Sequence, residues 1–183
     1  MSEIQIIEGS ACLPELAKLR FDVWKETGDL VLKDYRESDW VDSHDDHAIH
    51  GLIREGGELL GAIRICTHSE LTDAPDYAFY PKDRGVRRTT DLPLACLNRL
   101  VVRASAQRAG YGERLVRFAI ERSKALGARS ALISSNSRVI RFFEKLGFIP
   151  IGDLAFDPKK PALPLQFMLL RLHSGKREGV SRA

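Results

Sequence analysis

Residues 97–120 read LNRLVVRASAQRAGYGERLVRFAI, and this stretch decides which fold the chain is expected to adopt. An apolar run comes first, then a turn with two glycines around one aromatic residue, and then apolar residues at helical spacing. We therefore predict a buried strand at 95–103 and a helix at 111–126, which Gly127 ends. The turn between them, QRAGYG at 107–112, raises the question of whether it binds a phosphate.

Three kinds of phosphate-binding turn are glycine-rich, and two of them fit this segment poorly. A Walker loop needs Gly-Lys-Ser/Thr, but Gly112 is followed by Glu-Arg. A dinucleotide fingerprint needs a small residue at its third glycine position, where Leu115 stands. The pattern Gln/Arg-x-x-Gly-x-Gly between a strand and a helix fits Gln107, Gly110 and Gly112 without a gap. On the turn alone, a purely structural corner remains open as well.

The third pattern has a physical basis in the helix that follows it. The first N–H groups of a helix lack partners within the helix and carry a partial positive charge. Glycine lets the backbone approach a phosphate closely and adopt a positive φ, and Arg108 and Arg114 add cationic side chains. The turn is therefore suited to an anionic ligand.

Upstream, the spacing of apolar residues predicts a strand, a helix, an irregular acid-rich segment and a β-hairpin. Gly28 ends the helix, and two consecutive glycines form the hairpin turn. A long turn-rich connection follows, which compact domains usually keep only for function or disorder. The expected ranges are 4–7 for the strand, 13–27 for the helix, 33–47 for the irregular segment, 48–54 and 59–66 for the hairpin, and 67–95 for the connection.

Downstream, the chain is expected to add three strands and one further helix. The helix is expected at 137–146, where the apolar residues follow the i, i+3, i+4, i+7 pattern: Val139, Phe142, Phe143 and Leu146. The expected strands are 130–134, 148–152 and 164–172. We predict one α/β domain at 1–172, with a mixed, mostly antiparallel sheet and helices on both faces, and a disordered basic tail at 173–183.

Composition and charge restrict the class of protein. The chain has 183 residues, of which 44% are apolar and 29% charged, which is typical of one globular domain. Its 28 basic and 25 acidic residues leave a net charge of +3, too small to indicate nucleic-acid binding. Cys12, Cys66 and Cys96 form no CxxC pair, which argues against a disulfide framework or a zinc site. Without a signal peptide or an apolar run of about 18 residues, we expect a cytoplasmic protein with no membrane partner.

The segment from LNRLVV to FFEKLGF, residues 97–148, resembles the core of the GCN5-related N-acetyltransferase (GNAT) superfamily. The shared features are the strand ending in RLVV, the Q-x-x-G-x-G turn, a long helix, a strand, Asn136 and the helix that ends in FFEKLGF. The upstream order of strand, helix, loop and hairpin also fits. More loosely, LRFDVW at 19–24 and DDHAIH at 45–50 are similar to the branch that contains acyl-homoserine-lactone synthases.

This resemblance implies a splayed pair of central strands that holds an acyl-CoA, most simply acetyl-CoA, as co-substrate, and no metal. Backbone amides of Leu100, Val101 and Val102 would bind the pantetheine arm. Asn136 would contact the cofactor and Phe142 would lie nearby, although core packing is the alternative for Phe142. The pyrophosphate would lie on the turn formed by Gln107, Arg108, Ala109, Gly110, Tyr111, Gly112 and Glu113.

In the reaction that the resemblance implies, a neutral amine attacks the thioester carbonyl and coenzyme A leaves as a thiolate. The sequence departs from the superfamily at both usual acid–base positions. Phe143 stands where a tyrosine often acts as the acid, and Asn98 stands near the usual glutamate. A thiol pKa of about 8.5 makes the thiolate a tolerable leaving group without an acid. Loss of general acid catalysis costs roughly 10²–10⁴-fold in rate, so the reaction remains feasible.

The remaining candidates for a base are His44, His47 and His50, with Asp45 and Asp46, and His50 is the best single choice because it is expected on the first hairpin strand. Asn98, though no base, is the other candidate for a catalytic group. A metal site in the His- and Asp-rich segment is disfavoured, because His47 and His50 are three residues apart, which does not place them on one face of a strand. For His50, the alternative interpretation is a buried structural histidine.

The acceptor pocket is the part that the sequence determines least. Arg20, Trp24 and Arg99 are candidates to line it, with packing or a surface ion pair as the alternative for each. The segment 28–47 is rich in carboxylates, which would attract a cationic amine such as a polyamine, an aminoglycoside or a peptide lysine. A solvated acidic loop is the alternative, and an anionic acceptor would instead engage Arg20 or Arg99.

We therefore predict an N-acyltransferase that moves an acetyl group from acetyl-CoA to the primary amine of a small molecule or peptide. A longer acyl-CoA or an acyl-carrier-protein donor is one alternative, and an acyl-CoA-binding module without catalysis is another. The sequence leaves open the acceptor, the acyl length, the general base and acid, and whether the chain forms a homodimer.

Overall fold

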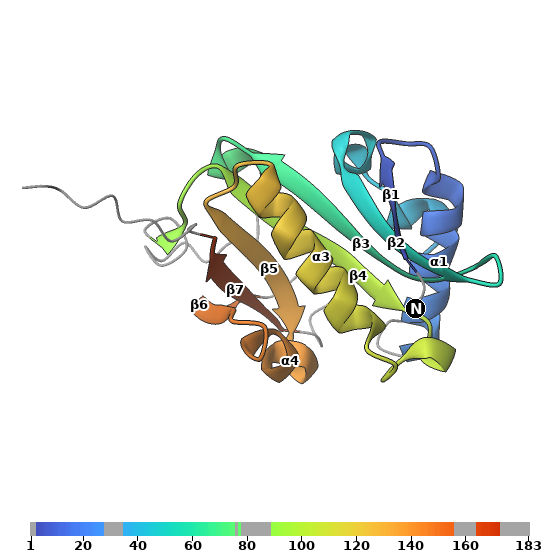
Figure 1. Cartoon of the computed structure of the whole chain (residues 1–183). Coiled ribbons are helices and arrows are strands. Elements are labelled where there is room, and N and C mark those ends of the chain that lie inside the picture. Colours follow the sequence, from blue (N-terminus) through green and yellow to red (C-terminus); the bar gives the residue numbers. More distant parts are fainter. Residues whose placement is uncertain (1–2, 28–34, 76, 78–88, 156–163, 173–183) are drawn as a thin grey trace, which may run out of the picture.

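The computed structural model describes residues 3–27, 35–75, 77, 89–155 and 164–172, and these form one seven-stranded sheet (Figure 1). The strand order is β1-β2-β3-β4-β5-β7-β6. Only β4 and β5 pair in parallel, so the predicted mixed, mostly antiparallel sheet is confirmed. The strands are β1 (Ile4–Glu8), β2 (Ile49–Glu55), β3 (Glu58–His68), β4 (Leu94–Val102), β5 (Ser130–Asn136), β6 (Ile149–Ala155) and β7 (Leu165–Arg171).

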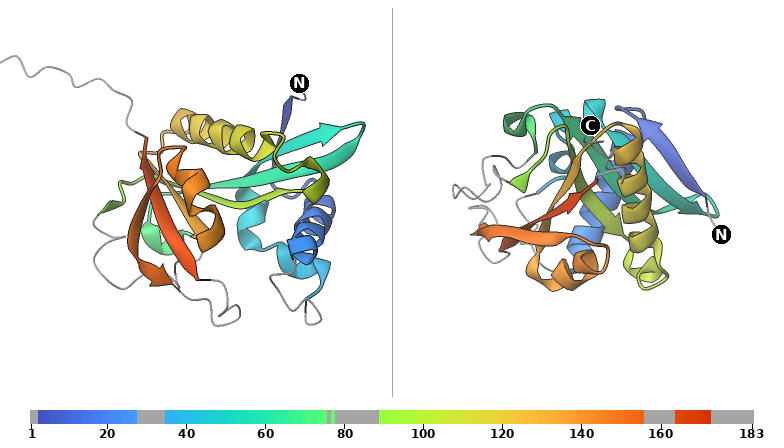
Figure 2. Two further views of the ribbon diagram at one scale, coloured as in Figure 1. Left: turned by 90° about the horizontal axis from the view of Figure 1, so that it is seen from below. Right: turned by 60° about the vertical axis from the view of Figure 1, so that its left-hand side comes forward.

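Helices cover both faces of the sheet, as predicted. Figure 2 (left) shows α1 and α3 on opposite sides of β3 and β4. The α-helices are α1 (Leu13–Thr27), α3 (Tyr111–Ala125) and α4 (Ile140–Glu144). Short 3-10 helices are η2 (Glu37–Trp40), η3 (Ser43–His47), η4 (Leu71–Asp73), η6 (Ala104–Ala106) and η7 (Ser137–Val139).

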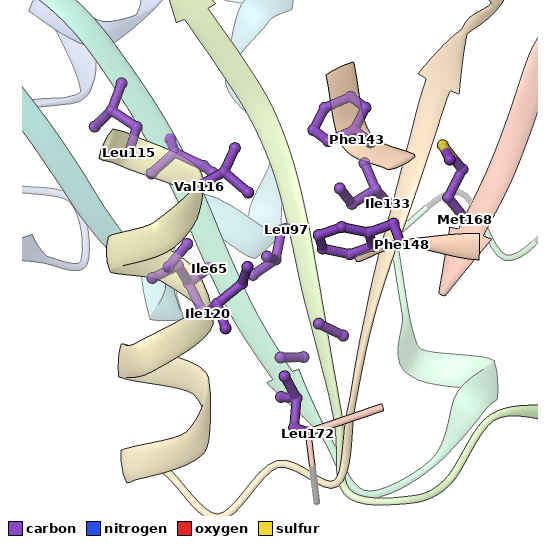
Figure 3. Packing of buried hydrophobic residues seen from close by; sticks show 14 of the residues in the cluster. Ile65, Leu97, Leu115, Val116, Ile120, Ile133, Phe143, Phe148, Met168 and Leu172 are labelled. Carbon is purple, nitrogen blue, oxygen red and sulfur yellow. The ribbon is translucent and has the colours of Figure 1, made fainter. Parts of the chain in front are cut away.

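The apolar face of α3 makes the largest core cluster. Leu115, Val116 and Ile120 lie against Ile65 and Leu97 of the sheet (Figure 3). These α3 residues recur at helical spacing, so burying one stripe of the helix removes them from water together. A second cluster packs α1 on the other face of the sheet, and this fixes the sheet between two helical layers.

The hairpin and the helix ends follow the glycine signals in the sequence. Gly56 and Gly57, both with positive φ (57° and 86°), join β2 to β3 in the two-residue turn that glycine favours. Gly127 has φ 80° directly beyond the end of α3. The hairpin prediction and the end of the long helix are therefore confirmed.

The predicted helix at 137–146 is shorter and broken. Its first residues form η7, because the Asn136 side chain accepts a hydrogen bond from the Arg138 N–H (3.0 Å) and caps a tight turn. Val139, the last residue of η7 and the N-cap of α4, has a non-helical φ of −113°. Part of the long connection at 67–95 and the whole tail at 173–183 lie outside the described residues.

Candidate functional site

The parallel strands β4 and β5 diverge at the centre of the sheet. They pair only from Leu94–Ser130 to Cys96–Leu132, and beyond this point they separate (Figure 1). The expected splayed pair is therefore present. A small cleft lies at the divergence, with a lining that is partly apolar and partly polar; its lining residues are Pro75, Cys96, Leu97, Asn98, Leu132, Ser134 and Phe167.

A β-bulge in β4 shapes one wall of this region. Ala62 pairs with Val101 and Arg64 pairs with Asn98, so the single residue between them on β3 lies opposite two residues of β4. Arg99 is the extra residue and has a left-handed φ of 53°. The bulge shifts the side-chain alternation, so Leu97 and Leu100 pack on the α3 side, while the Asn98 and Arg99 side chains both reach toward η3 and Arg64.

The glycine-rich turn connects the end of β4 to the start of α3. Gly110, with φ 83°, is the N-cap residue of α3, and Gln107 Nε2 donates a hydrogen bond to the Val102 carbonyl (3.1 Å). A Cβ at Gly110 would meet nothing within 4 Å, and a Cβ at Gly112 would lie 3.7 Å from the Phe142 ring. The turn therefore presents open backbone at a helix N-terminus, beside Phe142.

The predicted cofactor residues fall into two groups around the splay. Leu100, Val101, Val102, Phe142 and the turn from Gln107 to Glu113 are brought together by β4, α3 and α4. Asn136 ends β5 on the other side of the splay, and its side-chain oxygen is engaged by the Arg138 N–H. Contact of these residues with acyl-CoA stays a prediction.

An ion-pair network joins α1, η3, β3 and β4 on the face of the sheet that α1 covers. Its members, called here the arginine–aspartate network, are Arg20, Asp42, Asp45, Arg64 and Arg99. Asp45 pairs with Arg20 and with Arg64 (both 2.9 Å), and Asp42 pairs with Arg64 (2.6 Å) and Arg99 (2.8 Å). Arg20, Arg64 and Asp45 are at most 1% exposed. Buried charges of this kind hold a structure together only while each has its partner.

His50 is buried against this network. Its Nε2 lies 3.4 Å from the Asp45 carbonyl oxygen, and its Nδ1 is buried without a hydrogen-bond partner among the described residues. Burial, followed by the charge of Arg20, lowers the pKa of the imidazole, so the ring is neutral at pH 7. This position agrees with the alternative of a structural histidine, because a fully buried ring cannot exchange protons with an amine in the cleft.

The acidic segment is less open to solvent than its sequence indicates. Asp42 and Asp45 are taken up by arginines, whereas Glu37, Asp39 and Asp46 are exposed. Residues 28–34 lie outside the described residues. The acidic wall that would attract a cationic amine is therefore partly neutralised.

The three predicted acceptor residues have different surroundings. Arg20 is buried in the network and also donates to the Trp40 carbonyl (2.9 Å). Trp24 stacks on Trp40 with ring centroids 5.6 Å apart. Only Arg99, with 25% of its side chain exposed, keeps part of a charged group in solvent next to Asn98. For Arg20, the geometry favours an ion pair within the fold.

The sequence did not predict that Arg64 and Trp40 are buried at this network. The only signal for Arg64 was a charged residue within the apolar run LLGAIRIC, where it would need a buried partner. Within the described part of the chain, no group of three or more His, Cys, Asp or Glu side chains is arranged to hold a metal ion. None of the described helices is long and apolar enough to cross a membrane.

Acid should weaken the fold through this network. Burial alone would raise the pKa of the Asp42 and Asp45 carboxyls, but their arginine partners hold both pKa values below the usual range. The unfolded chain then binds more protons than the folded one, so the stability is complete above about pH 4 and is lost as the pH falls. We expect the urea concentration at the unfolding midpoint to decrease when the pH is lowered from about 5 to 3. The Asp42→Asn variant should unfold at a lower urea concentration than the native protein at pH 7, and this midpoint should decrease less on acidification. An equally large decrease in the variant would show that the acid sensitivity does not come from Asp42.

The family is decided by a sequence match that spans the splay, the turn and the network. A family model described as the acetyltransferase (GNAT) family matches residues 13–148. The chain belongs to this family. No curated protein matches the chain.

Solved structures with the GNAT fold cover nearly the whole chain. The CoA-dependent acyl-homoserine lactone synthase BjaI has a TM-score of 0.73 at 18% identity, with 95% of this chain and 85% of that chain covered. FeeM, an N-acyl amino acid synthase from uncultured soil microbes, has a TM-score of 0.70 at 16% identity, with 94% and 91% covered. An acyl-CoA N-acyltransferase from Pseudomonas aeruginosa has a TM-score of 0.64 at 17% identity, with 92% and 99% covered. The expected likeness to the acyl-homoserine-lactone-synthase branch is therefore found in the fold.

Phe143 and Asn98, the two residues that the resemblance implies for the acid–base positions, carry neither a carboxylate nor a phenol. Phe143 is 5% exposed and packs edge-to-face on Phe142 and Phe148. Asn98 Oδ1 accepts a hydrogen bond from Arg64 Nε (2.7 Å), so its amide belongs to the wall of the cleft and to the network at once. Among the described residues that line the cleft, Asn98 therefore offers a hydrogen-bond donor rather than a base.

Proposed function

We propose that the protein is an acyl-CoA-dependent N-acyltransferase. The observation that carries the proposal is the divergence of β4 and β5: a small cleft lies where it begins, and β4 runs on from there to the turn whose Gly110 opens the N-terminus of α3. Beyond Cys96, the side of β4 that faces β5 suits an uncharged pantetheine arm, and the N–H groups at the start of α3 suit a pyrophosphate. One ligand with both chemistries is an acyl-CoA.

The chain's own backbone would supply most of the binding and catalysis. Beyond Cys96, β4 has no strand partner on its β5 side within the described residues, so its N–H groups on that side are available between Leu100 and Val102, although the Val102 carbonyl accepts from Gln107. Such N–H groups can hold the pantetheine arm and stabilise the negative charge that develops when an amine attacks the thioester. With Phe143 in the core, the sulfur would leave as a thiolate, and ordered water would carry the proton of the amine.

Acetyl-CoA is the simplest donor, and a longer acyl donor is the second candidate. Cys96, Leu97, Leu132 and Phe167 give the cleft apolar walls, and each buried methylene of an acyl chain would contribute about 0.8 kcal/mol. BjaI, which shares the fold at a TM-score of 0.73, was solved with isopentyl-CoA, whose acyl group is longer than acetyl, and this supports including longer donors in the test. The three cysteines are thiols, which suits the proposed cytoplasmic location.

Thiol release measured with a panel of amines tests the proposal. We expect free coenzyme A to appear from acetyl-CoA only when an acceptor is present, because the amine must attack before the thiolate leaves. Octanoyl-CoA and octanoyl-acyl-carrier protein, in parallel, separate the two donor candidates through their kcat/KM values. A protein that binds these donors but releases no thiol with any amine would instead be a binding module.

A further inference from the structure

The arginine–aspartate network carries more positive than negative charge. Three arginines face two aspartates, which leaves one positive charge in excess, and the neighbouring His50 is neutral. The side chains of Arg20 and Arg64 are 1% and 2% exposed, whereas that of Arg99 is 25% exposed. The excess charge is therefore accessible at one end only, at Arg99, which directly follows the cleft-lining residue Asn98 in β4.

The guanidinium of Arg99 has hydrogen-bonding capacity that the fold does not use. One nitrogen donates to Asp42 Oδ2 (2.8 Å), and among the described residues the group has no other hydrogen-bond partner. A guanidinium has five N–H donors in a planar fork, so one edge can still bind a carboxylate through two parallel bonds. The left-handed backbone of the bulge holds the side chain in this direction.

Asn98 adds a second donor beside Arg99. Because arginine has no acceptor, the bond from Arg64 Nε fixes the Asn98 oxygen toward Arg64 and leaves its NH₂ group as a donor. Asn98 also lines the cleft. Next to the divergence of β4 and β5, the chain therefore presents a guanidinium edge and an amide NH₂, while the nearest carboxylates are held by arginines.

We propose that the acceptor amine carries a carboxylate, as an α-amino acid does, and that Arg99 and the Asn98 amide bind this carboxylate. The inference rests on the proposed acyltransferase function and names its acceptor class. A carboxylate held there would place a neighbouring amine at the divergence of β4 and β5, where the thioester would lie. A polyamine or a peptide lysine would bring a second positive charge to Arg99, and like charges oppose binding.

Matched acceptors test this inference directly. Each amino acid is compared with the amine that lacks only its carboxylate: phenylalanine with phenethylamine, tyrosine with tyramine, and lysine with cadaverine. With a donor that gives thiol release, we expect the kcat/KM of at least one amino acid to exceed that of its partner by about 10-fold or more, the effect of one charge-assisted hydrogen bond. A preference for the decarboxylated amine in every pair would overturn the inference.

The variant Arg99→Gln assigns the effect to this side chain. We expect it to raise KM for the preferred amino acid by about 10- to 100-fold and to change kcat/KM for the decarboxylated amine less than about threefold. Arg99→Lys, which keeps the charge but loses the fork, should restore part of the affinity. Asp42 keeps Arg64 as a partner in both variants, so we expect both to fold. Arg122→Gln, which removes a surface pair with Glu8, is the control and should leave kcat/KM unchanged for both acceptors.

Two further outcomes distinguish a wrong acceptor assignment from a wrong proposed function. If Arg99→Gln lowers kcat/KM equally for the amino acid and for its decarboxylated partner, the inference is wrong and the acyltransferase function stands. If the native protein releases no thiol with any acceptor or donor, the proposed function fails, and the acceptor assignment fails with it.

Discussion

Gly110→Trp is expected to weaken acetyl-CoA binding by about 100-fold or more, measured by calorimetry. The space beside this glycine is open, so an indole there would occupy the position that a pyrophosphate needs over the first N–H groups of α3. Each charge-assisted hydrogen bond contributes about 1.5–3 kcal/mol, so the loss of two accounts for two orders of magnitude. Thiol release should fall in parallel at donor concentrations below KM.

Gly57→Trp is the matched control for the strain that tryptophan introduces. Gly57 has φ 86° against 83° for Gly110, and a Cβ at either position meets nothing within 4 Å. Both variants therefore place a bulky L-residue in left-handed backbone with open surroundings, but Gly57 lies in the hairpin turn. Gly110→Ala adds the strain without the bulk and should lose much less affinity. Unchanged binding in a folded Gly110→Trp protein would show that the turn is only a structural corner.

Local sequence signals predicted most of the individual elements. The helical spacing of Leu115, Val116 and Ile120 marks the buried stripe of α3, and the glycine pair at 56 and 57 marks the hairpin turn. These features depend on residues within a few positions of one another. The insertion of β7 between β5 and β6 could not be read in this way, because it depends on pairing between segments distant in the chain.

The bulge at Arg99 also lacked a sequence signal. Positive φ is usually indicated by glycine or asparagine, and arginine rarely adopts it. The superfamily resemblance placed a ligand on this strand, but it did not indicate which side chains would face η3. Asn98 is a catalytic candidate because it stands near the usual glutamate position, and the structure adds that its oxygen accepts a hydrogen bond from Arg64.

The network was hidden for a different reason. Asp42 and Asp45 belong to a run of acidic residues that looks solvated, and Arg64 lies 22 and 19 positions away from them in the sequence. These carboxylates are shielded from solvent because η3 packs on β3, which places them in ion pairs with Arg64. Charge alternation along the chain does not contain this information. The sequence therefore indicated a cationic acceptor, and the structure leads us to propose an anionic group on the acceptor.

Asp45→Ala is expected to destabilise the fold by about 3–5 kcal/mol, measured by urea unfolding at pH 7. Asp45 is fully buried and pairs with both Arg20 and Arg64, and it accepts the Asp42 N–H (2.9 Å). Removing its carboxylate leaves the Arg20 guanidinium buried with the Trp40 carbonyl as its remaining hydrogen-bond partner. A buried cation without a counter-charge is costly, and this explains why the loss exceeds the value of an ordinary ion pair.

Asp22→Ala provides the comparison for Asp45→Ala, because Asp22 pairs with Lys18 and Arg103 nearer the surface and should lose less than about 1 kcal/mol. If the two variants lost similar stability, the network would contribute no more than a surface pair. The double variant Arg20→Met/Asp45→Leu removes both buried charges of one pair, so it should be more stable than Asp45→Ala. Recovery of stability without recovery of activity would then show that the network has two roles, one in holding the fold together and one in orienting Arg99 toward the acceptor through Asp42.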